Sequence, residues 1–158
     1  MAVPQDVPIT PEGLAEVRRE LDQLVSVRRP DIVARIKAAR EHGDLSENFE
    51  YHSARNEQSF IETRILELEA IVKNHVLIEA PVASADTVQL ASRVTVEEEG
   101  APSETYRIVG PAEADPGSGR VSFESAMGKA LLGHRVGDEV EVNTPIGASY
   151  RVRITAIQ

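Results

Sequence analysis

Apolar residues recur with a helical period over residues 14–39. Leu14, Val17, Leu21, Leu24 and Val25 follow at helical spacing, and Ile32, Ile36 and Ala39 continue the same stripe. Thr10 can cap the start of this helix, and Pro11 suits its first position. Because proline has no amide hydrogen and clashes with the preceding turn, we predict a kink or short break at Arg28-Arg29-Pro30.

A second helical pattern follows a short polar interruption and ends near Asn74. Its apolar positions alternate steps of three and four, as in the seam of a coiled coil, at Tyr51, Ala54, Gln58, Ile61, Ile65, Leu68 and Val72. Two such stripes joined by a tight turn can bury each other as an antiparallel hairpin. At 1.5 Å per residue, each arm would be roughly 42–48 Å long, so we predict a projecting rod.

The period shortens after residue 80, which indicates β-strands. Candidate strands cover residues 93–97, 105–109, 120–123, 139–142 and 150–157, and one short helix covers 125–132 before Gly133. The sequence therefore predicts an α+β protein with two domains. Residues 1–80 would form the antiparallel coiled-coil hairpin, and residues 81–158 a small, mostly antiparallel sheet with one helix.

Composition narrows the classes of function. The 158 residues carry a net charge of −9, which does not resemble the basic surface of an independent nucleic-acid binder. The chain has no cysteine, so thiol catalysis and thiolate metal sites are excluded. No apolar run approaches the roughly 20 residues of a membrane helix. The start, MAVPQDVPITPEG, lacks the features of a signal peptide, so we expect a cytoplasmic protein.

The polar interruption, EHGDLSENFEYH at residues 41–52, contains a cluster of acids. Asp44 or Ser46 could cap the second helix, and Asp-x-x-Glu resembles a capping box. Alternatively, Asp44 and Glu47 are three residues apart, close enough to present two carboxylates to one point beyond the turn. Hard oxygen ligands suit Mg²⁺, although two alone would hold it weakly, so further ligands would have to come from a partner.

Several segments resemble one known family. Residues 40–52, REHGDLSENFEYH, are closely similar to the tip signature of the Gre transcript-cleavage factors of the GreA type. The segments VRRP at 27–30, TYRIVG at 105–110, and LLG at 131–133 followed by VGD at 136–138 also resemble the family. The resemblance spans nearly the whole chain, and it implies a coiled-coil hairpin followed by an FKBP-like domain.

The resemblance also implies a mechanism. Such factors dock on bacterial RNA polymerase and pass the hairpin through its secondary channel to the backtracked RNA 3′ end, which the polymerase then hydrolyses. Asp44 and Glu47 match the acids that help hold the second catalytic Mg²⁺ and position water. Arg55 and Arg40 would contact RNA, and Asn48 and Tyr51 would support the tip. The docking region would include Ser125, Ala126, Met127 and Gly128. We expect a monomer that has no activity of its own and binds no Mg²⁺ tightly when free.

Two positions depart from the family pattern. Phe49 stands where a small residue, often alanine, is usual, and Ala126 replaces the usual proline of a Ser-Pro pair. Two alternative functions stay open. One is a Gre-like protein that occupies the channel as an inhibitor without cleavage. The other is a peptidyl-prolyl isomerase with a helical arm, although Tyr106, Phe123 and Tyr150 are few aromatic residues for a proline pocket.

Overall fold

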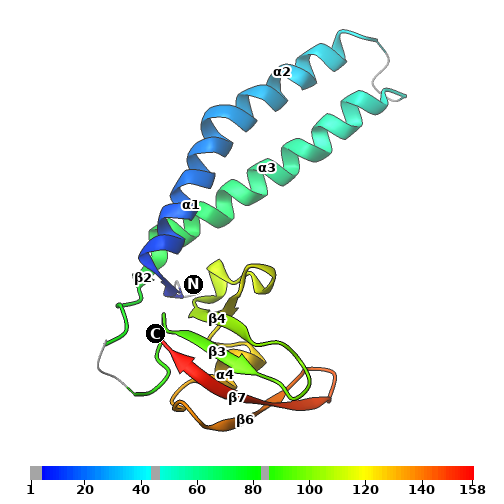
Figure 1. Ribbon diagram of the computed structural model, residues 1–158. Coiled ribbons are helices and arrows are strands. Elements are labelled where there is room, and N and C mark those ends of the chain that lie inside the picture. Colours follow the sequence, from blue (N-terminus) through cyan, green and yellow to red (C-terminus); the bar gives the residue numbers. More distant parts are fainter. Residues whose placement is uncertain (1–4, 44–46, 83–85) are drawn as a thin grey trace. The chain divides into compact units, whose positions relative to one another are not determined.

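A computed structural model describes residues 5–43, 47–82 and 86–158 (Figure 1). The chain divides into two compact units. The hairpin unit is Leu14–Asn74, and the sheet unit combines Met1–Gly13 with His75–Gln158. This division differs from the predicted boundary between residues 80 and 81, because residues 5–13 and the segment after Asn74 belong to the sheet unit.

The hairpin unit consists of two antiparallel arms (Figure 1). The first arm continues from α1 (Pro11–Gln23) through a π-helical segment, η1 (Leu24–Arg28), into α2 (Arg29–Arg40), and the second arm is α3 (Phe49–Asn74). The break predicted near Pro30 takes the form of η1, where the amide of Arg29 donates to the carbonyl of Leu24, five residues back. Such a wider turn is one way for a helix to continue past an amide that cannot donate.

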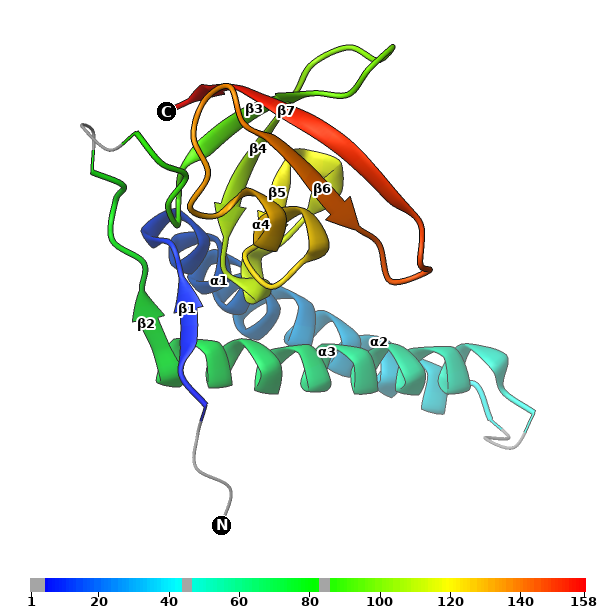
Figure 2. The same ribbon diagram turned by 90° about the horizontal axis from the view of Figure 1, so that it is seen from below.

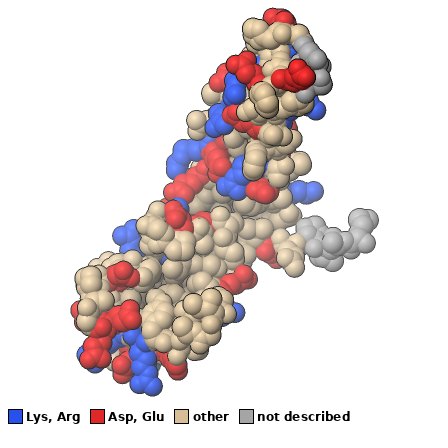
Figure 3. Space-filling model, turned by 90° about the vertical axis from the view of Figure 1, so that its right-hand side faces the viewer, with Lys and Arg blue, Asp and Glu red and all other residues tan. Residues whose placement is uncertain are grey.

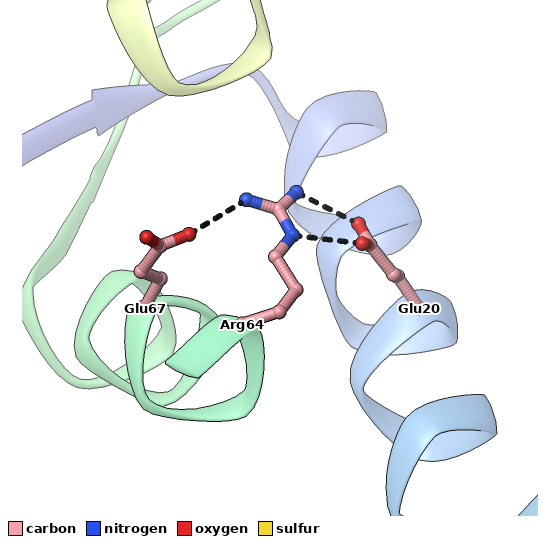
Figure 4. Close-up of polar contacts among 3 residues, drawn as sticks. All are labelled: Glu20, Arg64 and Glu67. Carbon is pink, nitrogen blue, oxygen red and sulfur yellow. Dashed lines mark hydrogen bonds and ion pairs between the residues drawn. The ribbon is translucent and has the colours of Figure 1, made fainter. Parts of the chain in front are cut away.

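The apolar seam of the hairpin is narrow. Among the described residues, its buried cluster contains five, Ile32, Ile36, Ala54, Ile61 and Ile65, with Leu21, Leu24 and Tyr51 packed against it. Arginines and glutamates connect the arms beside this seam. Arg64 on α3 reaches Glu20 on α1 with two hydrogen bonds of 2.8 and 3.0 Å, and also contacts Glu67 at 3.2 Å (Figure 4). Arg29 forms a similar two-bond pair with Glu62, both at 2.8 Å.

The sheet unit is built on five strands in the order β5-β4-β3-β7-β6. These are β3 (Arg93–Glu97), β4 (Glu104–Val109), β5 (Arg120–Ser122), β6 (Glu139–Asn143) and β7 (Ser149–Ile157). All neighbours are antiparallel except β4 and β5, which are parallel and joined through two short 3-10 helices, η2 (Pro111–Glu113) and η3 (Pro116–Ser118). The sheet curves around α4 (Ala126–Leu131), whose Leu131 is fully buried (Figure 2).

A second, two-stranded sheet brings distant parts of the sequence together. Strand β1 (Val7–Ile9) pairs in parallel with β2 (His75–Leu77). Three residues are too few to show a hydrophobic period, so the sequence did not indicate these strands. Gly110 lies against β1 so closely that a Cβ there would stand 1.9 Å from the carbonyl oxygen of Pro8.

Thr10 caps α1, as predicted. Its hydroxyl oxygen accepts a hydrogen bond from the amide of Gly13 at 3.1 Å. Its own amide and hydroxyl both donate to the carboxylate of Glu113, and the hydrogen bond from the amide is 2.6 Å long. Thr10 and Glu113 are both buried. The predicted α+β architecture, a helical hairpin followed by a sheet with one short helix, is confirmed. No helix within the described ranges is long and apolar enough to cross a membrane.

Candidate nucleic-acid interface at the hairpin tip

The end of the hairpin is held by Asn48, the residue just before α3. Its side-chain oxygen accepts from the amide of Tyr51 at 3.1 Å, and its side-chain nitrogen donates to the carbonyl of Ala39 at 2.6 Å. The first bond caps α3, and the second adds a side-chain donor to a carbonyl near the end of α2 that also accepts from the amide of His42 at 3.2 Å. Asn48 therefore ties the two arms together across the turn. Sequence reasoning gave Asn48 a supporting role but looked for the cap at Asp44 or Ser46.

The structure describes one of the two acids of the predicted metal site, Glu47. Glu47 is exposed and directly precedes the capping residue, and it makes no hydrogen bond or ion pair with the described part of the chain. Asp44, like Ser46, lies outside the described residues. Figure 3 shows acidic side chains at the end of the hairpin and a mixture of acidic and basic side chains along its length. Because Asn48 caps α3, Glu47 is not required for that role.

The predicted basic and aromatic residues of the tip make local contacts. The guanidinium carbon of Arg40 lies 5.8 Å from the centre of the Tyr51 ring, within range of a cation–π contact. The ring of Tyr51 also meets His52 edge-on, with centroids 5.5 Å apart. Arg55 is exposed and donates to Gln58 at 3.1 Å. Arg40 is thus oriented by Tyr51, whereas Arg55 lies one turn farther along α3.

An open groove of about 490 Å³ lies beside the tip, between α2 and the start of α3. It is lined by Arg35, Ala38, Ala39, Phe49, Glu50, Ser53 and Ala54. Phe49 is 88% exposed, although it is the first residue of α3 and follows the Asn48 cap. Sequence reasoning noted Phe49 as a departure from the family pattern but did not predict the groove. The groove brings together residues from two helices whose small side chains give no distinctive signal along the chain.

The predicted docking residues lie at the start of α4. The Ser125 hydroxyl accepts from the amide of Gly128 at 3.1 Å and donates to the carbonyl of Ser122 at 2.6 Å. A Cβ at Gly128 would stand 2.1 Å from that carbonyl oxygen, so only glycine fits there. Ala126 occupies the first helical position, where proline is also well suited. The cap is therefore made without the proline of the usual Ser-Pro pair.

Comparison with known proteins gives matches over both halves of the chain. Residues 7–76 match the family model described as transcription elongation factor, N-terminal, and residues 82–158 match transcription elongation factor, GreA/GreB, C-term. Transcription elongation factor GreA of Limosilactobacillus fermentum is 45% identical over 100% of both chains. The GreA of Geobacillus kaustophilus is 47% identical over the same shares. A solved structure of the transcription factor Gfh1 is 30% identical, with 99% of each chain covered and a TM-score of 0.47. The two GreA relatives, 45% and 47% identical over their full length, and the family models that match each half show that the chain belongs to the GreA/GreB family of transcription elongation factors.

Proposed function

We propose that this protein enters the secondary channel of bacterial RNA polymerase as a monomer and stimulates the polymerase's own hydrolysis of a backtracked RNA 3′ end. Membership in the elongation-factor family implies an interaction with RNA polymerase. The hairpin unit supplies a narrow two-helix arm, and the close similarity of residues 40–52 to the family's tip signature supports cleavage as the task of its end.

The observation that carries the proposal is the exposed carboxylate of Glu47 beside a helix that is already capped. A carboxylate near a helix start is often explained by capping or by the helix dipole. Here the Asn48 side chain accepts from the third amide of α3, so capping does not account for Glu47. Asp44, three residues earlier, would supply the second carboxylate.

The donor set fits Mg²⁺, which prefers carboxylate oxygens and retains several waters. Asp44 and Glu47 would hold an ion that is shared with the polymerase and the RNA phosphate, and the free protein would bind it weakly. When bound, the ion would supply an activated water and stabilise the charge that develops on phosphate. Arg40 and Arg55 would contact RNA phosphates through charge-assisted hydrogen bonds, and Asn48 would hold the backbone on which Glu47 is carried. The turn from Ser125 to Gly128 would contribute to docking on the polymerase.

A cleavage assay on defined backtracked complexes tests the proposal. Asp44→Asn and Glu47→Gln should each lower the cleavage rate at saturating factor by orders of magnitude, while binding to the polymerase survives. Glu41→Gln is the matched control, because Glu41 is another exposed acid at the end of α2. It should cleave like the unmodified protein. The double variant should lose about as much as the more damaging single variant, because ligands of one ion act as a unit.

The same assay separates the alternatives. A protein that binds the polymerase, slows elongation and leaves backtracked RNA intact would be an inhibitor, and the cleavage proposal would be wrong. Normal cleavage by both single variants would remove the metal role of the tip. Naked RNA should stay intact with the free protein, and a peptide isomerisation assay should show no activity in the sheet unit.

A further inference from the structure

Phe49 is the feature of the tip that neither the fold nor the proposed metal site explains. Its side chain is 88% exposed, whereas Ala39 and Ala54, which line the same groove, are 3% and 1% exposed. Exposing a large apolar side chain contributes nothing to the stability of the hairpin. An aromatic ring held on a helix end, two residues from Glu47, is instead placed to meet something that approaches the tip.

The groove beside Phe49 combines small apolar side chains with hydrogen-bond acceptors. Ala38 is exposed in it, and Ala39 and Ala54 lie buried beneath it. None of the three has side-chain atoms beyond Cβ, so a planar group can come close to both helices. Glu50 and Ser53 line the same groove and can accept hydrogen bonds. The third polar side chain of the groove, Arg35, is already paired with Glu57 at 2.6 Å. The volume of about 490 Å³ lies within the range of about 300–1,000 Å³ that is common for small-ligand sites.

A planar, apolar-faced group that carries hydrogen-bond donors on its edge is a nucleobase. Aromatic side chains stack on bases of any sequence, and carboxylates accept from exocyclic amino groups. An acidic peptide or a phosphate would instead be repelled by Glu50. Under the proposed function, the molecule that reaches the tip and carries exposed bases is the extruded RNA.

We propose that Phe49 and the groove form a subsite for one unpaired base of the extruded RNA, stacked on the phenyl ring with its amino edge facing Glu50 and Ser53. This inference rests on the proposed function, because it takes the RNA to the tip as given. It adds a base-binding residue to a tip whose other predicted contacts involve only phosphate and metal. The subsite predicts that cleavage depends on the identity of the extruded bases.

The test compares Phe49→Ala with Phe60→Ala on the same helix. Phe60 is also exposed, at 78%, but it lies three turns farther from the tip and does not line the groove. The measured quantity is the cleavage rate per concentration of factor, at low factor concentration, on complexes backtracked by a fixed number of nucleotides. Phe49→Ala should lower it roughly five- to hundredfold, as expected from the loss of one base stack, and Phe60→Ala should leave it unchanged. Phe49→Trp should keep it.

A second experiment uses extruded RNA that lacks the bases but keeps the phosphodiester chain. On complexes with abasic nucleotides in the extruded segment, the unmodified protein and Phe49→Ala should cleave at the same rate. On normal RNA, replacing guanine by hypoxanthine, which lacks only the amino group, should lower the rate for the unmodified protein and have less effect on Glu50→Gln. These comparisons use the full chain and do not depend on its absolute activity.

The outcomes distinguish the two proposals. If Phe49→Ala loses the same factor on abasic and normal RNA, the ring contacts the protein wall of the channel and the base subsite is wrong. If Phe49→Ala cleaves normally on both, the subsite is also wrong, although the metal role of Asp44 and Glu47 stands. If Asp44→Asn and Glu47→Gln cleave normally, the proposed function fails, whatever happens at Phe49.

Discussion

Within the part of the chain that the structure describes, ten buried apolar residues pack in one cluster in the sheet unit, whereas the buried cluster of the hairpin unit has five. In the hairpin, ion pairs between the two arms add to this smaller apolar cluster. Arginines of one arm pair with glutamates of the other on both sides of its seam, as at Arg29–Glu62 and Arg64–Glu20. In the sheet unit, by contrast, Leu131 from α4 packs among valines and isoleucines of the sheet.

The difference follows from what each unit must do under the proposed function. An arm that enters a channel has to be thin, so it cannot carry a thick core. Two helices in contact bury one stripe each, and long charged side chains cover the edges of that stripe. The sheet unit has no such limit and can bury side chains from a sheet and a helix together. The hairpin therefore carries its exposed end on two helices that bury only a narrow apolar stripe between them.

The largest expected effect on stability comes from Leu131→Ala. A fully buried leucine truncated to alanine should lower the free energy of unfolding by about 2–5 kcal/mol. Hydrogen exchange should show faster opening of amides in β3 to β7. Ile65→Ala, at a buried seam position, should instead speed exchange along α2 and α3. If both variants opened the same amides, the two units would share one cooperative core, and the contrast between them would be lost.

A smaller effect is expected at the tip from Asn48→Ala. The variant loses the cap of α3 and the bond to the carbonyl of Ala39, so we expect a loss of about 1–2 kcal/mol. The loss should be local, with faster hydrogen exchange at the Tyr51 amide and unchanged exchange in the sheet unit. Asn56→Ala is the matched control, because Asn56 is exposed within α3 and alanine favours the helix interior. Equal effects of the two changes would contradict the capping role.

The sequence predicted the parts of the fold that depend on residues close together along the chain. The seam of α3 and the cap at Thr10 are two such parts, and both predictions are confirmed. The pairing of β1 with β2 was missed, since it joins residues about seventy positions apart and is three residues long. The buried bond between Thr10 and Glu113 was missed for the same reason.

The candidate site was predicted less completely than the fold. The spacing of Asp44 and Glu47 indicated a ligand pair, but the capping alternative could not be weighed until Asn48 was seen to accept from Tyr51. The groove beside Phe49 was not predicted, because small alanines of α2 and α3 become a surface only when the helices are packed.

The smallest expected effect concerns a single ion pair across the hairpin, Glu20 with Arg64. Hydrogen bonds from Arg64 are the main cause that holds the pKa of the Glu20 carboxyl below its usual range. Both side chains are 44% exposed, so solvent screens the pair and Glu20→Gln should cost only about 0.2–1 kcal/mol at pH 7. A double-mutant cycle with Arg64→Met would isolate the pair from other effects of the changes.

The coupling energy between Glu20 and Arg64 should depend on pH in a direction set by the pKa of Glu20. A carboxyl whose pKa is lower in the folded than in the unfolded protein stabilises the fold at pH values above its unfolded pKa. This stabilisation is lost as the pH falls through its folded pKa. The coupling between Glu20 and Arg64 should therefore be constant near neutral pH and vanish in acid, below the usual carboxyl range. In the sheet unit, Tyr106 should lose its stabilising effect at high pH instead of low pH. The hydrogen bond to Glu104 raises the pKa of Tyr106 to about 12. The stabilisation from this tyrosine is therefore complete below pH ~10 and is lost as pH rises toward 12. Thermal unfolding of the variants Glu20→Gln and Tyr106→Phe across pH would check both. A Glu20 coupling that persisted in acid would show that packing of the side-chain stems, and not charge, holds the arms together at this point.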